Sequence, residues 1–555
     1  MSGISRRDFL ATAIAAGTLT AAGLPRSVRA ADATIEILAS EPIGTISPNI
    51  YGHFVEHLGA VVYDGIWVGE NSKIPNIGGI RKSIVDALKR IKAPLIRYPG
   101  GCFADSYDWR DGIGLRAQRP RRTNFWYGVA GKEVPLTSTS RIEPNHFGTN
   151  EFIRFCQLVG GQPYLAANLR SLPAQEFWKW IEYCNSPAGS TTLADQRAAG
   201  SMGSRDPFSV EYWGIGNESW GCGGELTPDE YAQEFRRFTA AYPPYDVPLK
   251  FIGAGASSDD PKWTRGFFSN IREKSEGLFK RRVYAWGIHH YSWNVSGGRT
   301  TDWNQGKGDA VKFDTEQYYE LLRAADKIDD YIKEHWAIMG EYDRQHHVKI
   351  AVDEWGSWHR PGTEIKPEHL LGQQNTMRDA LVAGLTLDIF NRHSDKVVMG
   401  NIAQLVNCLH SLFLADGPRF MLTPTYHVFE MYVPHMSAQS VRTAFKAPDV
   451  SYERNGKPAS FSAFNGSASV KGKQLTLTVT NSSMSDTREA DIVVRGARVA
   501  SAIAKVLSTK DVHAHNTFEN PQAVEPRDAV VKVSGESVAF RFEPASVTSL
   551  QMTLS

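Results

Sequence analysis

Tyr212-Trp213-Gly214-Ile215-Gly216-Asn217-Glu218 is the stretch that decides the fold, and Val352-Asp353-Glu354-Trp355-Gly356 repeats its pattern further along the chain. In each stretch, apolar and small residues typical of a buried strand end at a glutamate. An ionised carboxylate at the edge of an apolar core costs several kcal/mol unless something in the protein uses it. Two such glutamates, one preceded by Asn and one followed by Trp, suggest a carboxylate pair that cleaves glycosidic bonds.

The segments around these stretches alternate in the manner of a (β/α)8 barrel. Short apolar runs predict strands, and stretches with helical spacing lie between them. The predicted strands cover 50–57, 94–101, 163–170, 212–218, 250–256, 283–291, 350–354 and 398–407, and the predicted helices include 80–91, 150–158, 227–239, 315–335 and 373–393. Glu218 then ends the fourth strand and Glu354 the seventh, so both carboxylates are expected in one pocket at the carboxyl end of the barrel.

The regions outside the barrel have a different composition. Residues 434–555 alternate short strands with Asn, Ser, Gly and Lys turns, which predicts an all-β, jelly-roll-like sandwich. We expect the catalytic barrel to cover 46–433, and residues 31–45 to hold an N-terminal strand that joins the sandwich. The polar insertions 186–206 and 294–308 predict surface loops on the barrel.

Residues 1–30 are typical of a twin-arginine signal peptide. Ser5-Arg6-Arg7-Asp8-Phe9-Leu10 carries the arginine pair, a mildly apolar run follows, and Val28-Arg29-Ala30 offers a cleavage site. We therefore expect an exported protein, periplasmic or extracellular, whose mature chain starts near Ala31. We expect no membrane association after signal cleavage, because no later stretch approaches the roughly 20 apolar residues that a membrane span needs.

Composition narrows the classes of ligand. Lys and Arg total 61 against 60 Asp and Glu, and they are scattered, so charge offers no argument for nucleic acid and a neutral polar substrate fits better. The chain has five cysteines, an odd number without a Cys-x-x-Cys spacing, which argues against both a disulfide framework and a zinc site.

Two neighbouring carboxylates can divide the work of glycoside hydrolysis. A retaining glycosidase needs one ionised carboxylate as nucleophile and one protonated carboxyl as acid, about 5–5.5 Å apart. Asn217 is suited to hydrogen-bond the sugar 2-hydroxyl, and Arg97, at the end of the second strand, to keep the nucleophile ionised. Either glutamate alone is more readily explained by a structural ion pair, whereas the two together on the expected strands favour catalysis.

Several segments resemble those of the α-L-arabinofuranosidases of glycoside hydrolase family 51, from about residue 40 to residue 435, with a weaker likeness in the sandwich. The resemblance implies a retaining, exo-acting furanosidase that acts on arabinan, arabinoxylan or arabino-oligosaccharides, needs no cofactor or metal, and assembles into homo-oligomers. The segments that carry it are Ile46–Gly59, Arg97–Gly101, Tyr107–Gly114, His146–Phe152, Tyr212–Glu218, Val352–Trp355 and Asn401–Asn407.

Matching positions in these segments imply roles for individual residues. Glu218 is the acid/base and Glu354 the nucleophile. The terminal furanose is contacted by Glu56, Asn217, Tyr291 and Gln404, and Trp358 lines its pocket. Cys102 departs from the family pattern, because most members carry a sugar-binding Asn there. Either the neighbouring Asp105 takes over this contact or the furanose preference differs. We expect Cys102 to line the site without acting as a nucleophile, since a thiol is a poor hydrogen-bond partner.

Two histidine motifs offer a competing metal hypothesis. His53-Phe54-Val55-Glu56-His57 matches the H-x-x-E-H zinc pattern, which requires a helix. Its surroundings predict a strand and a turn instead, so the two histidines would not share a face. His289-His290 lies in a strand, where neighbours point to opposite faces, so we expect one pocket-facing imidazole rather than a ligand pair.

Two further hypotheses stay open at this point. One is a related furanosidase, for example a galactofuranosidase, or a β-glucanase on the same barrel. The other is a non-catalytic carbohydrate-binding protein on a degenerate barrel.

Overall fold

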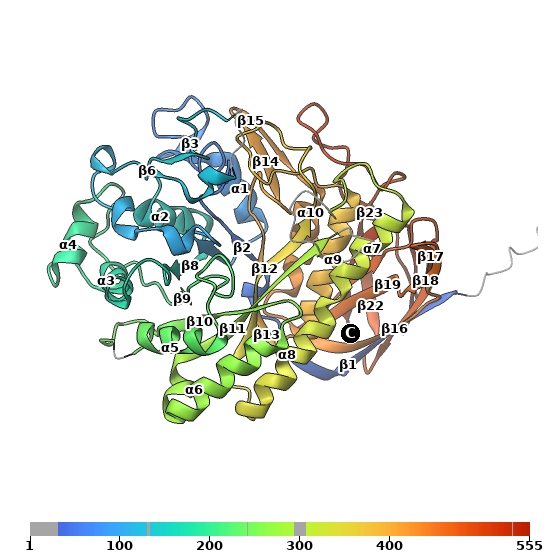
Figure 1. Cartoon of the computed structure of the whole chain (residues 1–555). Helices are drawn as coiled ribbons and strands as arrows, with labels where there is room; N and C mark the ends of the chain where they lie inside the picture. The colour runs from blue at the N-terminus through green and yellow to red at the C-terminus, as the bar shows by residue number, and fades with distance from the viewer. Residues whose placement is uncertain (1–30, 130–133, 241, 294–306, 535–536) are drawn as a thin grey trace, which may run out of the picture.

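The computed structural model describes residues 31–129, 134–240, 242–293, 307–534 and 537–555 (Figure 1). Within them, eight parallel strands close into a barrel in the order β10-β11-β12-β13-β2-β5-β8-β9. The predicted (β/α)8 barrel is therefore confirmed. Its strands are β2 (Gly52–Phe54), β5 (Leu95–Tyr98), β8 (Gln162–Ala167), β9 (Tyr212–Ile215), β10 (Lys250–Ser257), β11 (Val283–Trp293), β12 (Lys349–Trp358) and β13 (Val397–Ile402).

Apolar side chains fill one layer of the barrel interior. Seven strands each contribute one buried residue to a cluster that is separate from the main core, as side chains directed into a barrel are expected to do. Most of them lie at or near the amino ends of their strands, so the site is left to the opposite, carboxyl end. They are Leu95, Tyr164, Tyr212, Ile252, Ala285, Ala351 and Met399.

Helices cover the outside of the barrel (Figure 1). The helix expected over 315–335 is two helices that meet at Lys327, and the insertion expected as a loop over 186–206 carries α4, capped by the Thr191 hydroxyl. Most of the other insertion, 294–308, lies outside the described residues. The helices are α1 (Lys82–Arg90), α2 (Thr149–Val159), α3 (Ala174–Asn185), α4 (Thr192–Ala199), α5 (Pro228–Phe238), α6 (Pro261–Arg282), α7 (Thr315–Asp326), α8 (Ile328–Tyr342), α9 (Met377–Arg392) and α10 (Pro424–Tyr432).

A ten-stranded sheet follows the barrel and forms the all-β region, seen on the right of Figure 1. Its first member in the chain is β1, which pairs antiparallel with β16 and parallel with β21, so an N-terminal strand completes a C-terminal sheet. The sheet has its own apolar cluster. Its strands are β1 (Ala33–Thr45), β16 (Gln439–Lys446), β19 (Phe464–Lys471), β20 (Gln474–Asn481), β21 (Arg488–Arg495), β22 (Val499–Ser508), β23 (Arg527–Ala529), β24 (Lys532–Ser534), β25 (Ser537–Phe542) and β26 (Ser546–Leu554).

Helix α9 joins the two layers. All but its last residue are buried, because it packs on β12 of the barrel and on β19 and β20 of the sheet. The remaining described strands form two-stranded antiparallel pairs. These are β3 (Asn76–Ile77) with β4 (Ile80–Arg81), β6 (Arg122–Thr123) with β7 (Ile142–Glu143), β14 (Phe413–Asp416) with β15 (Arg419–Leu422), and β17 (Val450–Arg454) with β18 (Lys457–Phe461).

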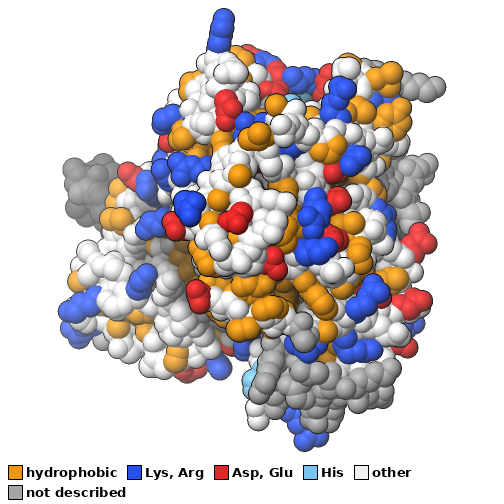
Figure 2. Space-filling view, turned by 90° about the vertical axis from the view of Figure 1, so that its left-hand side faces the viewer, with side chains coloured by type: hydrophobic (Ala, Val, Ile, Leu, Met, Phe, Trp, Pro, Cys, Tyr) orange, Lys and Arg blue, Asp and Glu red, His pale blue; other side chains and the backbone are white. Residues whose placement is uncertain are grey.

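The surface agrees with the balanced composition. On the face shown in Figure 2, acidic and basic side chains are interspersed, so this face does not present one sign of charge. Among the described residues, every helix is too short or too polar to cross a bilayer.

Candidate active site

Glu218 and Glu354 meet at the carboxyl end of the barrel. Glu218 follows β9 with a left-handed backbone (φ +40°), an uncommon conformation that concentrates at functional sites. Glu354 lies within β12 and its side chain is 6% exposed, against 20% for Glu218. One oxygen of each carboxylate lies within 4.8 Å of the other. This separation matches the roughly 5–5.5 Å of retaining glycosidases better than the roughly 6.5–9.5 Å of inverting ones.

Cys102 does not line the site as a free thiol. It forms a disulfide with Cys222, which lies 120 residues further on, and the argument against disulfide bonding was wrong on this point. The odd number of cysteines left one pair undetected, because only the fold brings the two Cα atoms to 5.6 Å; Cys156, Cys184 and Cys408 are free and buried.

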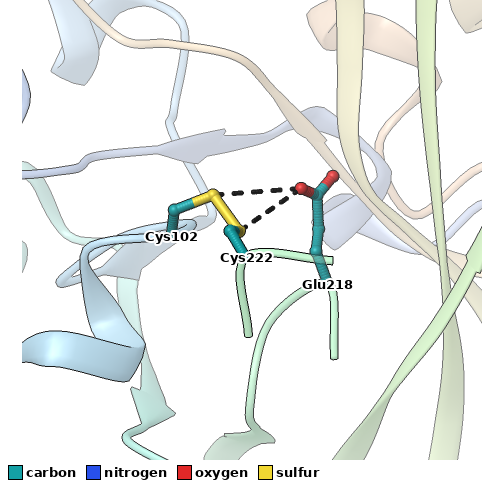
Figure 3. A group of neighbouring side chains, drawn as sticks. All are labelled: Cys102, Glu218 and Cys222. Atoms are coloured by element: carbon teal, nitrogen blue, oxygen red, sulfur yellow. Dashed lines mark hydrogen bonds between the residues drawn. A yellow bond between two sulfur atoms is a disulfide. The ribbon is translucent and has the colours of Figure 1, made fainter. Parts of the chain in front are cut away.

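The disulfide touches the proposed acid. The sulfurs of Cys222 and Cys102 lie 3.6 and 3.9 Å from Oε2 of Glu218 (Figure 3). Because a disulfide sulfur carries no proton, neither sulfur donates a hydrogen bond to the Glu218 carboxyl group.

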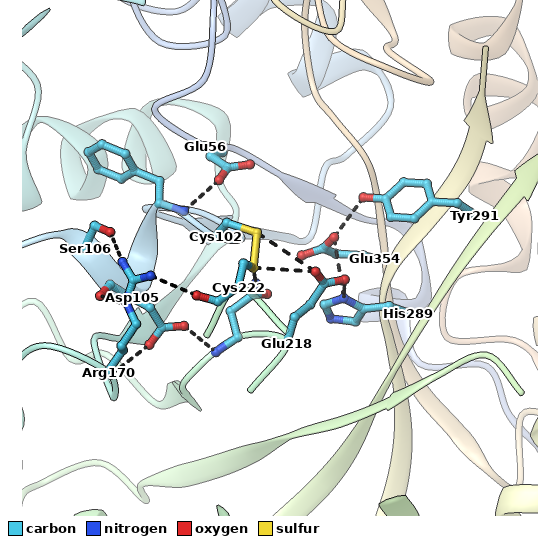
Figure 4. Close-up of a disulfide and its surroundings, with 12 residues drawn as sticks. Glu56, Cys102, Asp105, Ser106, Arg170, Glu218, Cys222, His289, Tyr291 and Glu354 are labelled. Carbon is cyan, nitrogen blue, oxygen red and sulfur yellow. Dashed lines mark hydrogen bonds and ion pairs between the residues drawn. A yellow bond between two sulfur atoms is a disulfide. The ribbon is translucent and has the colours of Figure 1, made fainter. Parts of the chain in front are cut away.

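His289, on β11, contacts both glutamates (Figure 4). Its Nδ1 is 3.0 Å from Oε1 of Glu218 and 3.5 Å from Oε2 of Glu354, and its Nε2 is 3.3 Å from Oδ1 of Asp353. Burial lowers the pKa of His289, but the charge of Glu354 and contacts with Asp353 and Glu218 outweigh burial and raise the pKa to about 10. The side chain is therefore an imidazolium near neutral pH, and it contacts the carboxyl groups of Glu218, Glu354 and Asp353. His290 points away, to the Ser258 hydroxyl and the Ala324 carbonyl.

Arg97 links the two sequence stretches. Its Nη1 donates to Oε1 of Glu354 at 2.7 Å and to the Asp353 carbonyl at 3.0 Å, and its Nη2 donates to Oδ1 of Asn217 at 2.6 Å. Burial lowers the pKa of Arg97, whereas Glu354 and Asp353 raise it by a larger amount, so the guanidinium stays charged. Oδ1 of Asn217 is therefore occupied, and its Nδ2 contacts the Cys222 sulfur at 3.8 Å, which leaves one N–H of the amide to donate to a substrate.

Two aromatic residues are linked to Glu354, because Tyr291 contacts it directly and Trp358 packs against Tyr291. The hydroxyl of Tyr291, on β11, donates to Oε2 of Glu354 at 2.8 Å. The Tyr291 ring meets the Trp358 ring edge to face at 5.1 Å, and the Lys307 ammonium lies 4.0 Å above Trp358. These contacts orient one nucleophile oxygen and form an aromatic wall.

Glu56 and Gln404 form a pair. Oε1 of Glu56 accepts from the Phe103 backbone N–H at 2.9 Å, and Oε2 accepts from Nε2 of Gln404 at 2.9 Å. Burial raises the pKa of Glu56 to about 8, a value to which the charge of Glu354 also contributes. Glu56 therefore holds its proton at neutral pH.

Asp105 does not replace the family asparagine as a sugar contact. It is fully buried and accepts backbone N–H groups from Leu169, Arg170 and Asn217, at 2.8, 3.3 and 3.0 Å. Burial raises the pKa of Asp105 to about 7 although these donors lower it. Its role is to hold the backbone of Asn217.

The H-x-x-E-H segment folds as a short strand and a turn. His57 contacts Glu143 and the Tyr98 hydroxyl, each at 2.8 Å, whereas His53 packs against Phe429. Burial lowers the pKa of His53 to about 3. Among the described residues, neither histidine belongs to a group of side chains close enough to hold an ion.

Three of these residues were not assigned from the sequence. Cys222 and the Phe103 backbone N–H carried no signal, because their roles depend on chain segments far apart in sequence. Asp353 directly precedes Glu354 in the chain, and this adjacency was the only signal that the sequence offered for it.

Comparison with known protein families gives two matches. Residues 87–305 match the model of the α-L-arabinofuranosidase 1 domain, and residues 353–546 match that of the α-L-arabinofuranosidase C-terminal domain. Together the two matches cover most of the barrel and the sheet.

Individual relatives agree over nearly the whole chain. The chain is 36% identical over 524 residues to a Bacteroides ovatus protein named intracellular exo-α-L-arabinofuranosidase, covering 94% of this chain and 95% of that one. The crystal structure of the GH51 arabinofuranosidase from Xanthomonas axonopodis pv. citri is 35% identical, with a TM-score of 0.85, over 94% of this chain and 100% of the other.

The expectation of export was wrong by these comparisons. The Bacteroides ovatus relative is named as intracellular, and so is an exo-α-(1→5)-L-arabinofuranosidase of Acetivibrio thermocellus, 30% identical over 66% of this chain and 68% of that protein. The twin-arginine pattern rests on a few residues of the segment 1–30, which lies outside the described residues.

Proposed function

The chain belongs to the α-L-arabinofuranosidases of glycoside hydrolase family 51 and is an exo-acting α-L-arabinofuranosidase, and from this premise we propose a retaining mechanism carried by Glu218 and Glu354. The observation that carries the proposal is the approach of the two carboxylates to within 4.8 Å around His289. This spacing suits a nucleophile and an acid that act on opposite sides of one glycosidic bond.

In the first step, a carboxylate oxygen of Glu354 attacks the anomeric carbon. The bond from this carbon to the leaving oxygen breaks, and that oxygen takes the proton of Glu218. Arg97 and the Tyr291 hydroxyl each hold one oxygen of Glu354, which keeps the nucleophile oriented and compensates its charge. The product is an arabinosyl ester of Glu354.

In the second step, Glu218 acts as a base. It removes a proton from water, the water oxygen attacks the anomeric carbon, and Glu354 leaves as a carboxylate. Two inversions restore the configuration of the sugar, and Glu218 regains its proton. The net reaction consumes one water molecule.

The remaining site residues bind the terminal sugar. We assign hydroxyl contacts to Glu56, Asn217 and Gln404, and the side wall to Trp358. Glu56 and Gln404 already hydrogen-bond each other, which fixes a donor and acceptor surface before substrate arrives. One N–H of the Asn217 amide faces the Cys222 sulfur at 3.8 Å, and we assign the other to the 2-hydroxyl, a contact that strengthens as positive charge develops on the ring. The proposed substrates are arabinan, arabinoxylan and arabino-oligosaccharides.

Proton NMR of the first-formed sugar tests this function. Hydrolysis of an α-L-arabinofuranoside should release the α-anomer first and mutarotation should follow. First release of the β-anomer would contradict the retaining mechanism. A panel of nitrophenyl glycosides separates arabinofuranosidase from galactofuranosidase and glucanase activity.

The organisation of the chain is a further part of the proposal. We infer that residues 46–433 form the catalytic unit and that 434–555, together with the strand in 31–45, form the β-sandwich. An apolar cluster made only of residues from 31–45 and 434–555 supports this division. Assembly into homo-oligomers is proposed from the family resemblance, and light scattering during size-exclusion chromatography tests it.

A further inference from the structure

The Cys102–Cys222 disulfide crosses the mouth of the barrel. Cys102 is in the loop after β5 and Cys222 in the loop after β9, and β8 stands between these two strands in the barrel order. The bond therefore joins two loops whose strands are not neighbours. Both sulfurs come from half-buried residues that border Glu218, as Figure 3 shows.

Cys222 belongs to the same turn as Glu218. The backbone N–H groups of Gly221 and Gly223 both donate to the Glu218 carbonyl, at 2.7 and 3.1 Å, so the turn closes on the residue that carries the acid. A Cβ atom on Gly223 would lie 1.9 Å from the Asn217 carbonyl oxygen, which shows how tightly the turn is packed. Cys222 is only four positions after Glu218 in this packed turn, so a displacement of Cys222 is expected to displace Glu218 as well.

Polar contacts hold the same two loops on the side away from the sugar pocket. Arg170 donates to the Cys222 carbonyl at 3.1 Å and to the Ser106 hydroxyl, and Asp105 accepts the Asn217 N–H at 3.0 Å (Figure 4). These bonds do not depend on sulfur. Loss of the disulfide should therefore leave the loops folded and free only the part of the turn that faces Glu218.

We propose that the Cys102–Cys222 disulfide is a positioning element for the general acid, and that its reduction selectively weakens protonation of the leaving group. A dithiol reductant gives two electrons and two protons to the bond, which becomes two thiols while the reductant becomes a disulfide. The covalent link between the loops after β5 and β9 is then lost. The new S–H groups can donate to Oε2 of Glu218, and such hydrogen bonds favour the ionised form of Glu218 over the protonated form.

The proposal rests on the role of Glu218 as acid. Substrates with different leaving groups test the role of the disulfide separately from the assignment of Glu218. An aryl leaving group needs little protonation, whereas a sugar hydroxylate needs it fully. We would measure kcat/KM for 4-nitrophenyl α-L-arabinofuranoside and for (1→5)-α-L-arabinobiose, before and after treatment of the full chain with dithiothreitol. Thiol titration in denaturant counts the conversion, from three free thiols to five.

On reduction, kcat/KM for arabinobiose should fall about tenfold or more, while that for the aryl substrate changes by less than about twofold. The variant Cys102→Ala/Cys222→Ala has neither the disulfide nor thiol donors beside Glu218. Its kcat/KM should therefore be reduced for arabinobiose but not for the aryl substrate, and reductant should change neither value. Cys156→Ala, which removes a free thiol in α2, should respond to reductant as the unmodified chain does.

Equal rates before and after reduction, or equal losses on both substrates, would overturn the proposal. So would a Cys102→Ala/Cys222→Ala variant that hydrolyses arabinobiose at the unmodified rate, a measurement that holds even if the reductant cannot enter. Glu218→Ala is the reference: if this variant shows no split between the two substrates, the assignment of the acid itself fails, independently of the disulfide.

Discussion

Nδ1 of His289 lies 3.0 Å from Oε1 of Glu218, and the same nitrogen lies 3.5 Å from Oε2 of Glu354. One imidazolium thus contacts both proposed catalytic carboxylates, and its Nε2 faces a third carboxylate, Asp353. Fixed charges aimed at reacting groups are a major source of enzymatic rate enhancement. We therefore expect His289 to act, together with Arg97 and Tyr291, as a positioning residue for the pair.

Replacement of His289 by Gln should therefore lower kcat/KM by about 10²–10³-fold, since a neutral amide leaves the carboxylates without their shared cation. His290→Gln is the matched control, because His290 contacts Ser258 and Ala324 outside the pocket. Equal losses in both variants would contradict a positioning role for His289.

His289 also predicts the response of stability to alkali. Its folded pKa, about 10, is above the ordinary value of 6.5, so its contribution is fully present below pH 6.5 and is lost as pH rises through 10. Thermal unfolding of the unmodified chain and of His289→Gln between these pH values should show a steeper alkaline loss in the unmodified chain. Parallel curves would contradict the charged state of His289.

Variants of the two glutamates should differ in the product that azide forms. Glu354→Ala should lose roughly 10⁴-fold or more of its activity. Azide should restore turnover of an activated substrate and give a β-configured azide, because it attacks directly. Glu218→Ala should accumulate the ester of Glu354, and azide should then give the α-configured product. The anomeric configuration measured by NMR decides between the two assignments, and reversed configurations would exchange the roles.

Glu56→Gln should stabilise the protein in alkali while weakening sugar binding. Burial raises the pKa of Glu56 from 4.5 to about 8. The free energy of unfolding of the chain therefore falls as pH rises from 4.5 through 8, because the unfolded state ionises Glu56 more readily. The variant avoids this loss, on the order of a few kcal/mol. Its melting temperature should exceed that of the unmodified chain at pH 9 and not at pH 4, while KM rises.

Asp388 provides the matched control for Glu56. It is buried on α9, accepts from Ser467 and Tyr432, which are not site residues, and has a pKa that burial raises to about 7. Asp388→Asn should show a similar change of stability with pH and an unchanged KM. A rise of KM in Asp388→Asn would mean that the effect of Glu56→Gln on KM is structural.

Arg97→Met should be among the most damaging single changes. Removal of one partner from a buried ion pair leaves Glu354 uncompensated, at a typical cost of about 3–5 kcal/mol. Circular dichroism melting measures this loss, and added arabinose should recover part of it. Arg495→Met, which breaks an exposed ion pair with Glu36, should cost far less; comparable losses would contradict the buried-pair argument.

Local pattern was enough for most of the architecture. Apolar runs that end at Glu218 and Glu354 marked two barrel strands, and the spacing of the others gave the order of the remaining six. The pattern could not separate α7 from α8, because both have apolar residues at helical spacing and Lys327 between them keeps a helical backbone (φ −58°, ψ −21°). It also missed α4, whose short amphipathic signal is weak among polar residues.

The sequence by itself determined the fold class, the two carboxylates and the family, because each depends on residues that are neighbours in the chain. Tertiary structure alone decided the pairing of Cys102 with Cys222, the charge of His289 and the proton on Glu56. Each of these depends on distances between segments far apart in sequence, and on the burial that those segments create together. Burial and charge at short range are properties of the folded chain, so local residue patterns do not contain them.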